Sequence, residues 1–177
     1  MRKFRIVHDY DIDLETWVFI MNNPVPEQDE IVYKLENVKD RVEIFREETE
    51  THVHAKTRCT AIGMIPTAVR HILKPHMLSW IEESTYDKNG FFWTWNIVPY
   101  YFKDRITCRG KMSILARDAG RCRRLTEGYL DIRMSMLQDF AERIIIEHLH
   151  RNFDQEYKLF NEVLKKRLVE IRKDSSQ

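Results

Sequence analysis

The sequence contains no apolar run that approaches the ~20 residues a helix needs to cross a bilayer. Its first nine residues also lack the apolar core of roughly 7–15 residues that a secretory signal carries, so we expect a cytoplasmic protein. Cysteine is scarce. Cys59, Cys108 and Cys122 include no CxxC pair, which indicates reduced thiols, although Cys108 and Cys122 would meet if they faced each other across a hairpin.

An excess of charge of either sign is also missing. Lys and Arg total 29 against 28 Asp and Glu, a net charge of +1, which argues against a general nucleic-acid binder. The sequence has no nucleophile elbow, phosphate loop or dinucleotide fingerprint, so we assign no catalytic residue and no cofactor. His52 and His54 would share one face of a strand, but two ligands do not make a metal site, and we predict none.

Glycine and proline number five each, and neither occurs between Ser135 and Ile171. Apolar residues recur there at steps of three to five, which predicts one amphipathic helix over 135–171. Such a helix would be about 55 Å long, so it must bend or project beyond a small domain. Its free part is a surface through which a homodimer could form.

The chain before this helix is typical of strands. We predict strands at 4–10, 42–49, 53–60, 78–86, 91–98, 105–117 and 121–134, and helices at 14–21, 27–35 and 67–73, the first of them capped by Asp11 or Asp13. Asn89-Gly90 and Asp118-Ala119-Gly120 are hairpin signals. The order predicts the α+β class, with an antiparallel sheet that carries its helices on one face, in a single domain of residues 1–177.

Several short motifs resemble those of the START-like (SRPBCC, helix-grip) superfamily, over about residues 3–170. The nearest branch is a group of uncharacterised bacterial START-like proteins, and the PRELI-type phospholipid transfer proteins are also similar. The motifs are Asp11-Ile12-Asp13-Leu14-Glu15-Thr16-Trp17, Ile62-Gly63-Met64-Ile65-Pro66, Trp80-Ile81-Glu82-Glu83, Pro99, Gly110, Asp118-Ala119-Gly120, Gly128 and Glu142. The segment from Tyr100 to Asp104 departs from the pattern, because it is more polar and aromatic than the family leads us to expect.

The resemblance implies a helix-grip fold, in which a curved antiparallel sheet of six to seven strands wraps around the long C-terminal helix. It also implies a hydrophobic ligand, with a phospholipid or fatty acid as the leading candidate, in a cavity between the two. The residues we expect to line that cavity are Trp80, Trp93, Trp95, Met112, Ile114, Leu130, Ile132, Phe140, Ile144 and His148. Arg109 is the expected contact for a polar headgroup.

A basic amphipathic segment is expected to cover the cavity mouth and to touch a membrane transiently during lipid transfer. Its residues are Met64, Ile65, Val69, Arg70, Ile72, Leu73 and Lys74. The plainer interpretation of this segment is an ordinary packed loop and helix.

Two other functions remain open at this point. One is a START-like cyclase or hydrolase acting on an aromatic or polyketide-like substrate. Since Glu82 and Glu83 would point to opposite faces of a strand, at most one of them would line such a site. The other is a protein-interaction module whose core is filled by its own Trp and Phe side chains.

Overall fold

The computed structural model describes residues 1–23, 25–62, 70, 74–134 and 138–174. The chain begins with β1 (Arg2–Tyr10), α1 (Leu14–Asn22), α2 (Pro26–Glu30) and the 3-10 turn η1 (Ile31–Lys34). The strands β2 (Val38–Glu48) and β3 (His52–Ala61) follow, then the 3-10 turn η3 (Pro75–Met77). The chain ends with β4 (Ser79–Asp87), β5 (Phe92–Pro99), β6 (Ile106–Arg117), β7 (Arg121–Ile132) and α3 (Gln138–Asp174).

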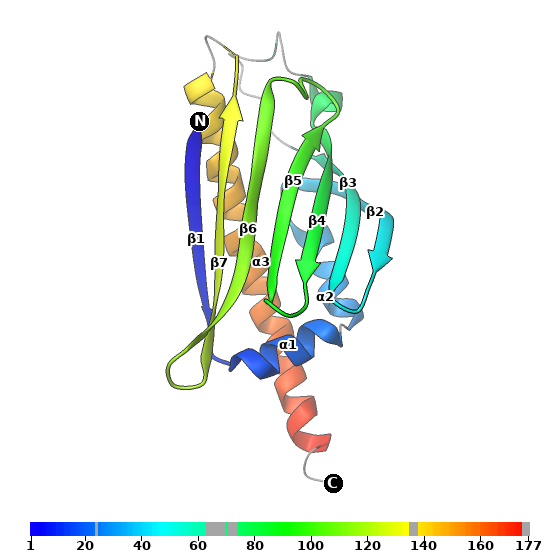
Figure 1. The fold of residues 1–177 in the computed structure, drawn as a ribbon, viewed down its shortest axis with the longest axis vertical. Coiled ribbons are helices and arrows are strands. Elements are labelled where there is room, and N and C mark those ends of the chain that lie inside the picture. The colour runs from blue at the N-terminus through cyan, green and yellow to red at the C-terminus, as the bar shows by residue number, and fades with distance from the viewer. Residues whose placement is uncertain (24, 63–69, 71–73, 135–137, 175–177) are drawn as a thin grey trace.

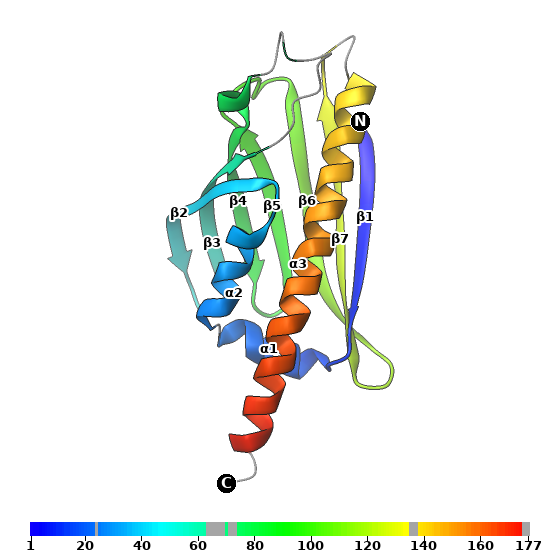
Figure 2. The same cartoon turned by 180° about the vertical axis from the view of Figure 1, so that it is seen from behind.

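The described strands form one seven-stranded sheet in the order β1-β7-β6-β5-β4-β3-β2, and each neighbouring pair is antiparallel. The chain therefore runs as a meander from β2 to β7, and β1 pairs with β7 at the sheet edge. The predicted α+β class is confirmed. The curved sheet carries its helices on one face (Figures 1 and 2).

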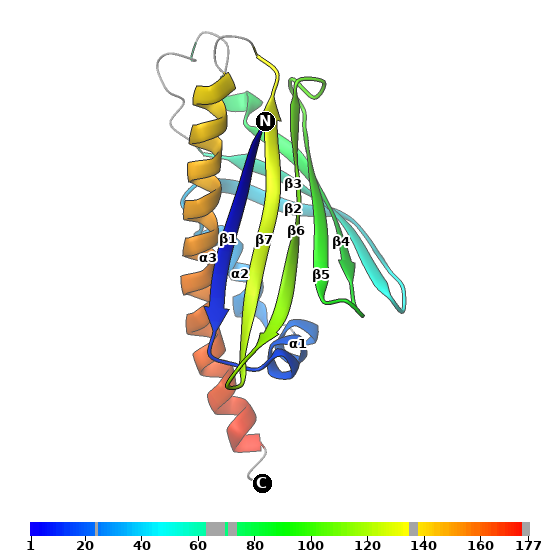
Figure 3. The same cartoon turned by 60° about the vertical axis from the view of Figure 1, so that its left-hand side comes forward.

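The long helix predicted over 135–171 is confirmed as α3, which is continuous over 37 residues. It runs along the sheet and continues past α1 at the C-terminal end (Figure 3). It therefore projects beyond the body rather than bending. Val169, in the projecting part, is exposed, and the homodimer through this part stays a prediction.

The main core lies where α1 and α3 meet the sheet. Trp17 of α1 is buried against Tyr10 of β1 and Phe160 of α3, with ring centroids 5.8–6.5 Å apart within this trio. The side chain of Asp13, one of the two predicted caps, caps α1 by accepting a hydrogen bond from the backbone N–H of Thr16. This packing holds the part of α3 around Phe160 against β1 and α1.

The structure corrects the suggestion that Cys108 and Cys122 face each other across a hairpin. Cys108 pairs with Leu130 and Cys122 with Ala116, so the two cysteines do not face each other; both are free and buried. The sheet register places them far apart along β6 and β7, because the hairpin turn lies at 118–120. The helix expected at 67–73 lies outside the described residues, apart from Arg70.

Candidate functional site

Strand alternation gives the sheet two distinct faces. The face toward α3, which we call the inner face, carries Phe4, Ile6, His8 and Tyr10 of β1, all of them buried. Following the strand pairing from β1, the inner face continues through the even-numbered residues of β7, β6 and β4 and the odd-numbered residues of β5 and β3. The opposite face, the outer face, is mostly polar.

Helix α3 covers only part of the inner face. It packs mainly against β1 and β7, with smaller contacts to η1 and α2 (Figure 2). Beneath it Leu130 and Ile132 are buried almost completely. Along β4 and β5, by contrast, the inner-facing side chains are only partly buried, including Trp80, Tyr86 and Trp93. An aromatic surface thus stays accessible on the inner side of the sheet.

Trp93 is the centre of this aromatic surface. Its ring stacks on Tyr86 at a centroid distance of 4.1 Å and meets the edge of Trp17 at 5.9 Å. Trp95, one step along the same face, stacks with Phe4 at 6.0 Å across the two glycines Gly110 and Gly128. The aromatic rings are therefore held by one another, and α3 does not bury them fully.

The cavity residues predicted from the sequence occupy two environments. Ile114, Leu130 and Ile132 are buried in the core, where they pack with neighbouring side chains. The partly buried ones lie on the inner face of the sheet or on α3, and they are Trp80, Trp93, Trp95, Met112, Phe140, Ile144 and His148. Within the described part of the chain, three buried nitrogen atoms of this set lack a hydrogen-bond partner: Nε1 of Trp80, Nε1 of Trp95 and Nδ1 of His148.

An ion pair that sequence reasoning missed lies on the inner face. The Arg41 guanidinium donates to the Glu82 carboxylate at 3.0 Å, and about a third of each side chain is exposed. Arg41 is opposite Cys59, and Glu82 is opposite Ile97. Burial, together with the nearby Glu82 carboxylate, raises the pKa of the Cys59 thiol to about 11.

The neighbouring glutamate is on the other face. Glu83 points outward and forms an ion pair with Lys56 at 2.9 Å, so only Glu82 faces α3, as alternation requires. The alternation of Trp80, Glu82 and Ser84 in one strand was the signal that could have placed Glu82 inside. Its partner Arg41 could not have been found, because 41 residues separate the two along the chain.

A second polar group holds α3 against the sheet. Arg124, buried on the inner face, donates to Glu156 at 2.7 Å and to the backbone oxygen of Phe153 at 3.3 Å. His8 lies beside it, bonded to Asp154 at 2.8 Å and stacked on the Tyr157 ring at 4.5 Å. Desolvation lowers the pKa of His8, partly offset by Asp154.

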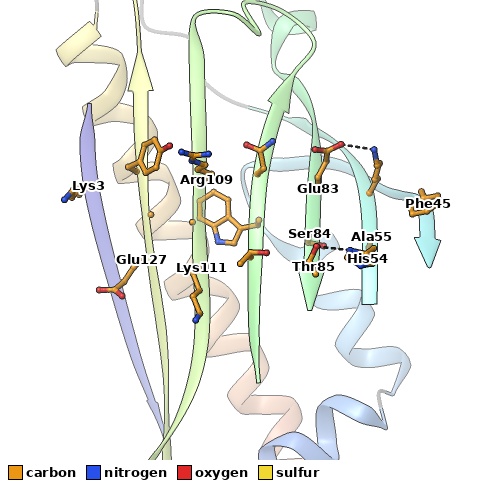
Figure 4. A pocket seen from close by; sticks show the side chains of 17 residues that line it. Lys3, Phe45, His54, Ala55, Glu83, Ser84, Thr85, Arg109, Lys111 and Glu127 are labelled. Atoms are coloured by element: carbon orange, nitrogen blue, oxygen red, sulfur yellow. Dashed lines mark hydrogen bonds and ion pairs between the residues drawn. The ribbon is translucent and has the colours of Figure 1, made fainter. Parts of the chain in front are cut away.

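The outer face carries a broad hollow of about 820 Å³ that extends from Lys3 of β1 to Phe45 of β2. In Figure 4 α3 lies behind the strands that carry the labelled side chains. The hollow lies on the face that is turned away from α3, and Arg109, Lys111 and Glu127 are among the residues that line it. It is therefore a different surface from the apolar cavity expected under α3.

Arg109 belongs to this outer hollow. Its guanidinium lies over the Tyr129 ring, 5.0 Å from the centroid, and both residues point away from α3. A ligand held between the sheet and α3 would be out of its reach. The structure therefore does not place Arg109 beside a headgroup in that cavity. Arg109 is odd-numbered in β6, and strand alternation turns its side chain to the outer face.

The segment expected to cover the cavity lies mostly outside the described residues, since Met64, Ile65, Val69, Ile72 and Leu73 are not among them. Arg70 and Lys74 are described and exposed, and Lys74 Nζ donates to the backbone oxygen of Arg70 at 2.8 Å. None of the described helices is long and apolar enough to span a membrane. Nor do the described residues bring three His, Cys, Asp or Glu side chains together in a metal-binding cluster.

Comparisons with known proteins identify the fold. No family model and no curated protein sequence matches the chain. Among solved structures, TTHA0849 from Thermus thermophilus is similar with a TM-score of 0.62 and 13% identity, over 91% of this chain and 95% of that one. The Zhui aromatase/cyclase from Streptomyces sp. R1128 is similar with a TM-score of 0.63 and 11% identity, over 94% and 95%. At such identities the likeness concerns the fold alone, and the fold is of the helix-grip type.

Proposed function

We propose that this protein binds one hydrophobic ligand, a phospholipid or fatty acid, between the inner face of β4 and β5 and helix α3, and that it transfers this ligand between membranes. The observation that carries the proposal is the partly buried aromatic surface around Trp93. A ligand on this surface would bury these rings further, and large aromatic side chains contribute most when they are removed from water.

The energetics of this surface favour an amphiphile. Each acyl CH₂ group buried there would contribute about 0.8 kcal/mol. The Arg41–Glu82 pair offers a polar contact on the same face, and pockets of this kind combine apolar walls with a few polar groups that orient the ligand. We therefore assign the headgroup contact to Arg41 and Glu82 in place of Arg109.

Native mass spectrometry of the freshly purified protein, followed by organic extraction, tests the proposal. A discrete adduct with the mass of a lipid is the expected result. An adduct of an aromatic or polyketide-like mass would instead favour the second candidate, an enzyme on the same fold that would use Glu82 as its acid or base. A ligand-free mass that does not change when lipid is added would refute both and favour a filled-core interaction module.

Substitutions at two adjacent residues of β4 test which face of the sheet holds the ligand. Ser84 faces inward between Trp95 and Ala55, whereas Thr85 faces outward and bonds to His54. Ser84→Trp should fill the space and abolish the adduct, while Thr85→Trp should leave it unchanged. Both substitutions put a residue with high strand propensity into β4, so equal thermal stability is the control for folding. Loss of the adduct in both variants would contradict the inner location.

A further inference from the structure

One end of the molecule exposes aromatic side chains. Tyr100 and Tyr101, in the connection between β5 and β6, are 52% and 40% exposed, and Ile62, after β3, is 56% exposed. Figure 1 shows that this connection and η3 lie at the same end, away from the C-terminus. The interior site proposed above does not use the segment from Tyr100 to Asp104.

Contacts with η3 and β4 hold this connection in place. The backbone N–H of Tyr100 donates to the oxygen of Ser79 at 3.2 Å, and the Tyr101 ring meets His76 edge-on at 5.6 Å. Phe102 has a φ of 58°, and its backbone oxygen accepts hydrogen bonds from the N–H groups of Arg105 and Ile106. The two tyrosines are thus presented by an ordered turn rather than by a long free loop.

The surroundings of the tyrosines are basic. Among residues 70, 74–79 and 99–105, the exposed charged side chains are Arg70, Lys74, Lys103, Arg105 and the single acid Asp104. Tyrosine is favoured where one end of a side chain meets apolar groups and the other meets water, as at a bilayer surface. Basic side chains beside it are attracted to the negative potential of anionic lipids.

We propose that this end of the protein, formed by η3 and the β5–β6 connection, docks on a lipid bilayer that carries anionic headgroups. Tyr100 and Tyr101 enter the interfacial region, and Lys74, Lys103 and Arg105 contact the headgroups. The inference deepens the proposed function, on which it rests, because it names the surface from which the ligand is taken. Exposed tyrosines among cations fit the interface of an anionic membrane.

Flotation with vesicles tests the docking surface. Wild-type protein should bind vesicles containing about one-third phosphatidylserine, and it should not bind pure phosphatidylcholine. Raising the salt from about 0.05 M to about 0.5 M should weaken the binding, because the Debye length shortens. Lys103→Gln and Arg105→Gln should each lower the partition coefficient of the protein between solution and vesicles about fivefold.

Substitution of the aromatic pair needs a matched control. Tyr100→Ser combined with Tyr101→Ser should abolish flotation. Phe19→Ser removes an equally exposed aromatic ring, 50% exposed, from α1 at the other end of the sheet, and should leave flotation unchanged. An unchanged thermal unfolding curve checks that each variant is folded. Equal binding to neutral vesicles, or equal loss with Phe19→Ser, would overturn the proposal.

The docking proposal and the ligand proposal fail in different ways. A wild-type protein that carries a lipid adduct in native mass spectrometry but does not float with anionic vesicles overturns the docking surface and leaves the interior site standing. A protein that floats, with the expected effect of the tyrosine variants, but never carries an adduct overturns the interior site and makes the surface a plain membrane contact.

Discussion

Neutralising Glu156 should destabilise the protein more than neutralising any exposed acid does. Arg124 lies on the inner face with only 4% of its side chain exposed, and the Glu156 carboxylate, at 2.7 Å, is its closest counter-ion. Glu156→Gln keeps the size and one acceptor oxygen but leaves the buried guanidinium without that charge. Removing one partner of a fully buried pair costs about 3–5 kcal/mol.

The expected cost here is smaller, for two structural reasons. Glu156 is 35% exposed, so water partly solvates the pair. The Phe153 carbonyl oxygen also remains as an acceptor for Arg124. We therefore expect Glu156→Gln to lower the free energy of unfolding by about 2 kcal/mol, or the melting temperature by about 4–8 °C for a chain of this size.

Urea unfolding followed by tryptophan fluorescence measures this change, and the adjacent arginine supplies the control. Arg123 forms a bidentate pair with Asp9 at 2.6 and 2.8 Å, but on the exposed side of the sheet. Asp9→Asn should cost at most about 1 kcal/mol, because exposed ion pairs contribute little. If Glu156→Gln costs no more than Asp9→Asn, the buried Arg124–Glu156 pair contributes no more to stability than an exposed ion pair does.

Three further predictions concern other parts of the core. Gly110→Ala should destabilise the fold by about 1–3 kcal/mol in urea unfolding, because an added Cβ would press on the Trp95 ring and the backbone of β7. The lowered pKa of His8 means that the unfolded chain binds more protons below about pH 6.5, so stability should fall as the pH drops from 7 to 5. His8→Gln should flatten that decline in pH-dependent melting curves; an unchanged slope would remove His8 as its cause. Burial raises the pKa of the three thiols, those of Cys59, Cys108 and Cys122, to about 11 or 12. A disulfide reagent should therefore label the native protein slowly and the urea-unfolded protein at once. Rapid labelling of the native protein would contradict the burial of these thiols.

Local patterns predicted the elements well, because each pattern reports a property of a few neighbouring residues. The absence of glycine and proline, together with the apolar spacing, indicated the long helix, and Tyr157, Phe160, Leu164 and Leu168 do pack against the core. The Asp13 cap and the hairpin at Asp118-Ala119-Gly120, where Ala119 and Gly120 have positive φ, follow from equally local chemistry.

The residues of the candidate site were harder to predict from the sequence, because they depend on which face each strand turns inward. Alternation within β6 separates Arg109 from Cys108 and Gly110, but the sequence does not state which set faces α3. Arg109 was expected to contact a polar headgroup in the cavity, although it alternates with these two residues along the strand. The register with β7, in which Arg109 lies beside Tyr129, settles its outward position.

The sequence by itself therefore determined the order of the elements, the one-sided sheet and the length of α3, since propensity and periodicity act over short stretches of chain. Only the tertiary structure decided that Arg41 meets Glu82, that Arg124 meets Glu156 and His8, and that α3 leaves the aromatic surface around Trp93 partly uncovered. These contacts join residues from 32 to 116 positions apart. They depend on sheet register and on where a long helix crosses the sheet, which no local pattern encodes.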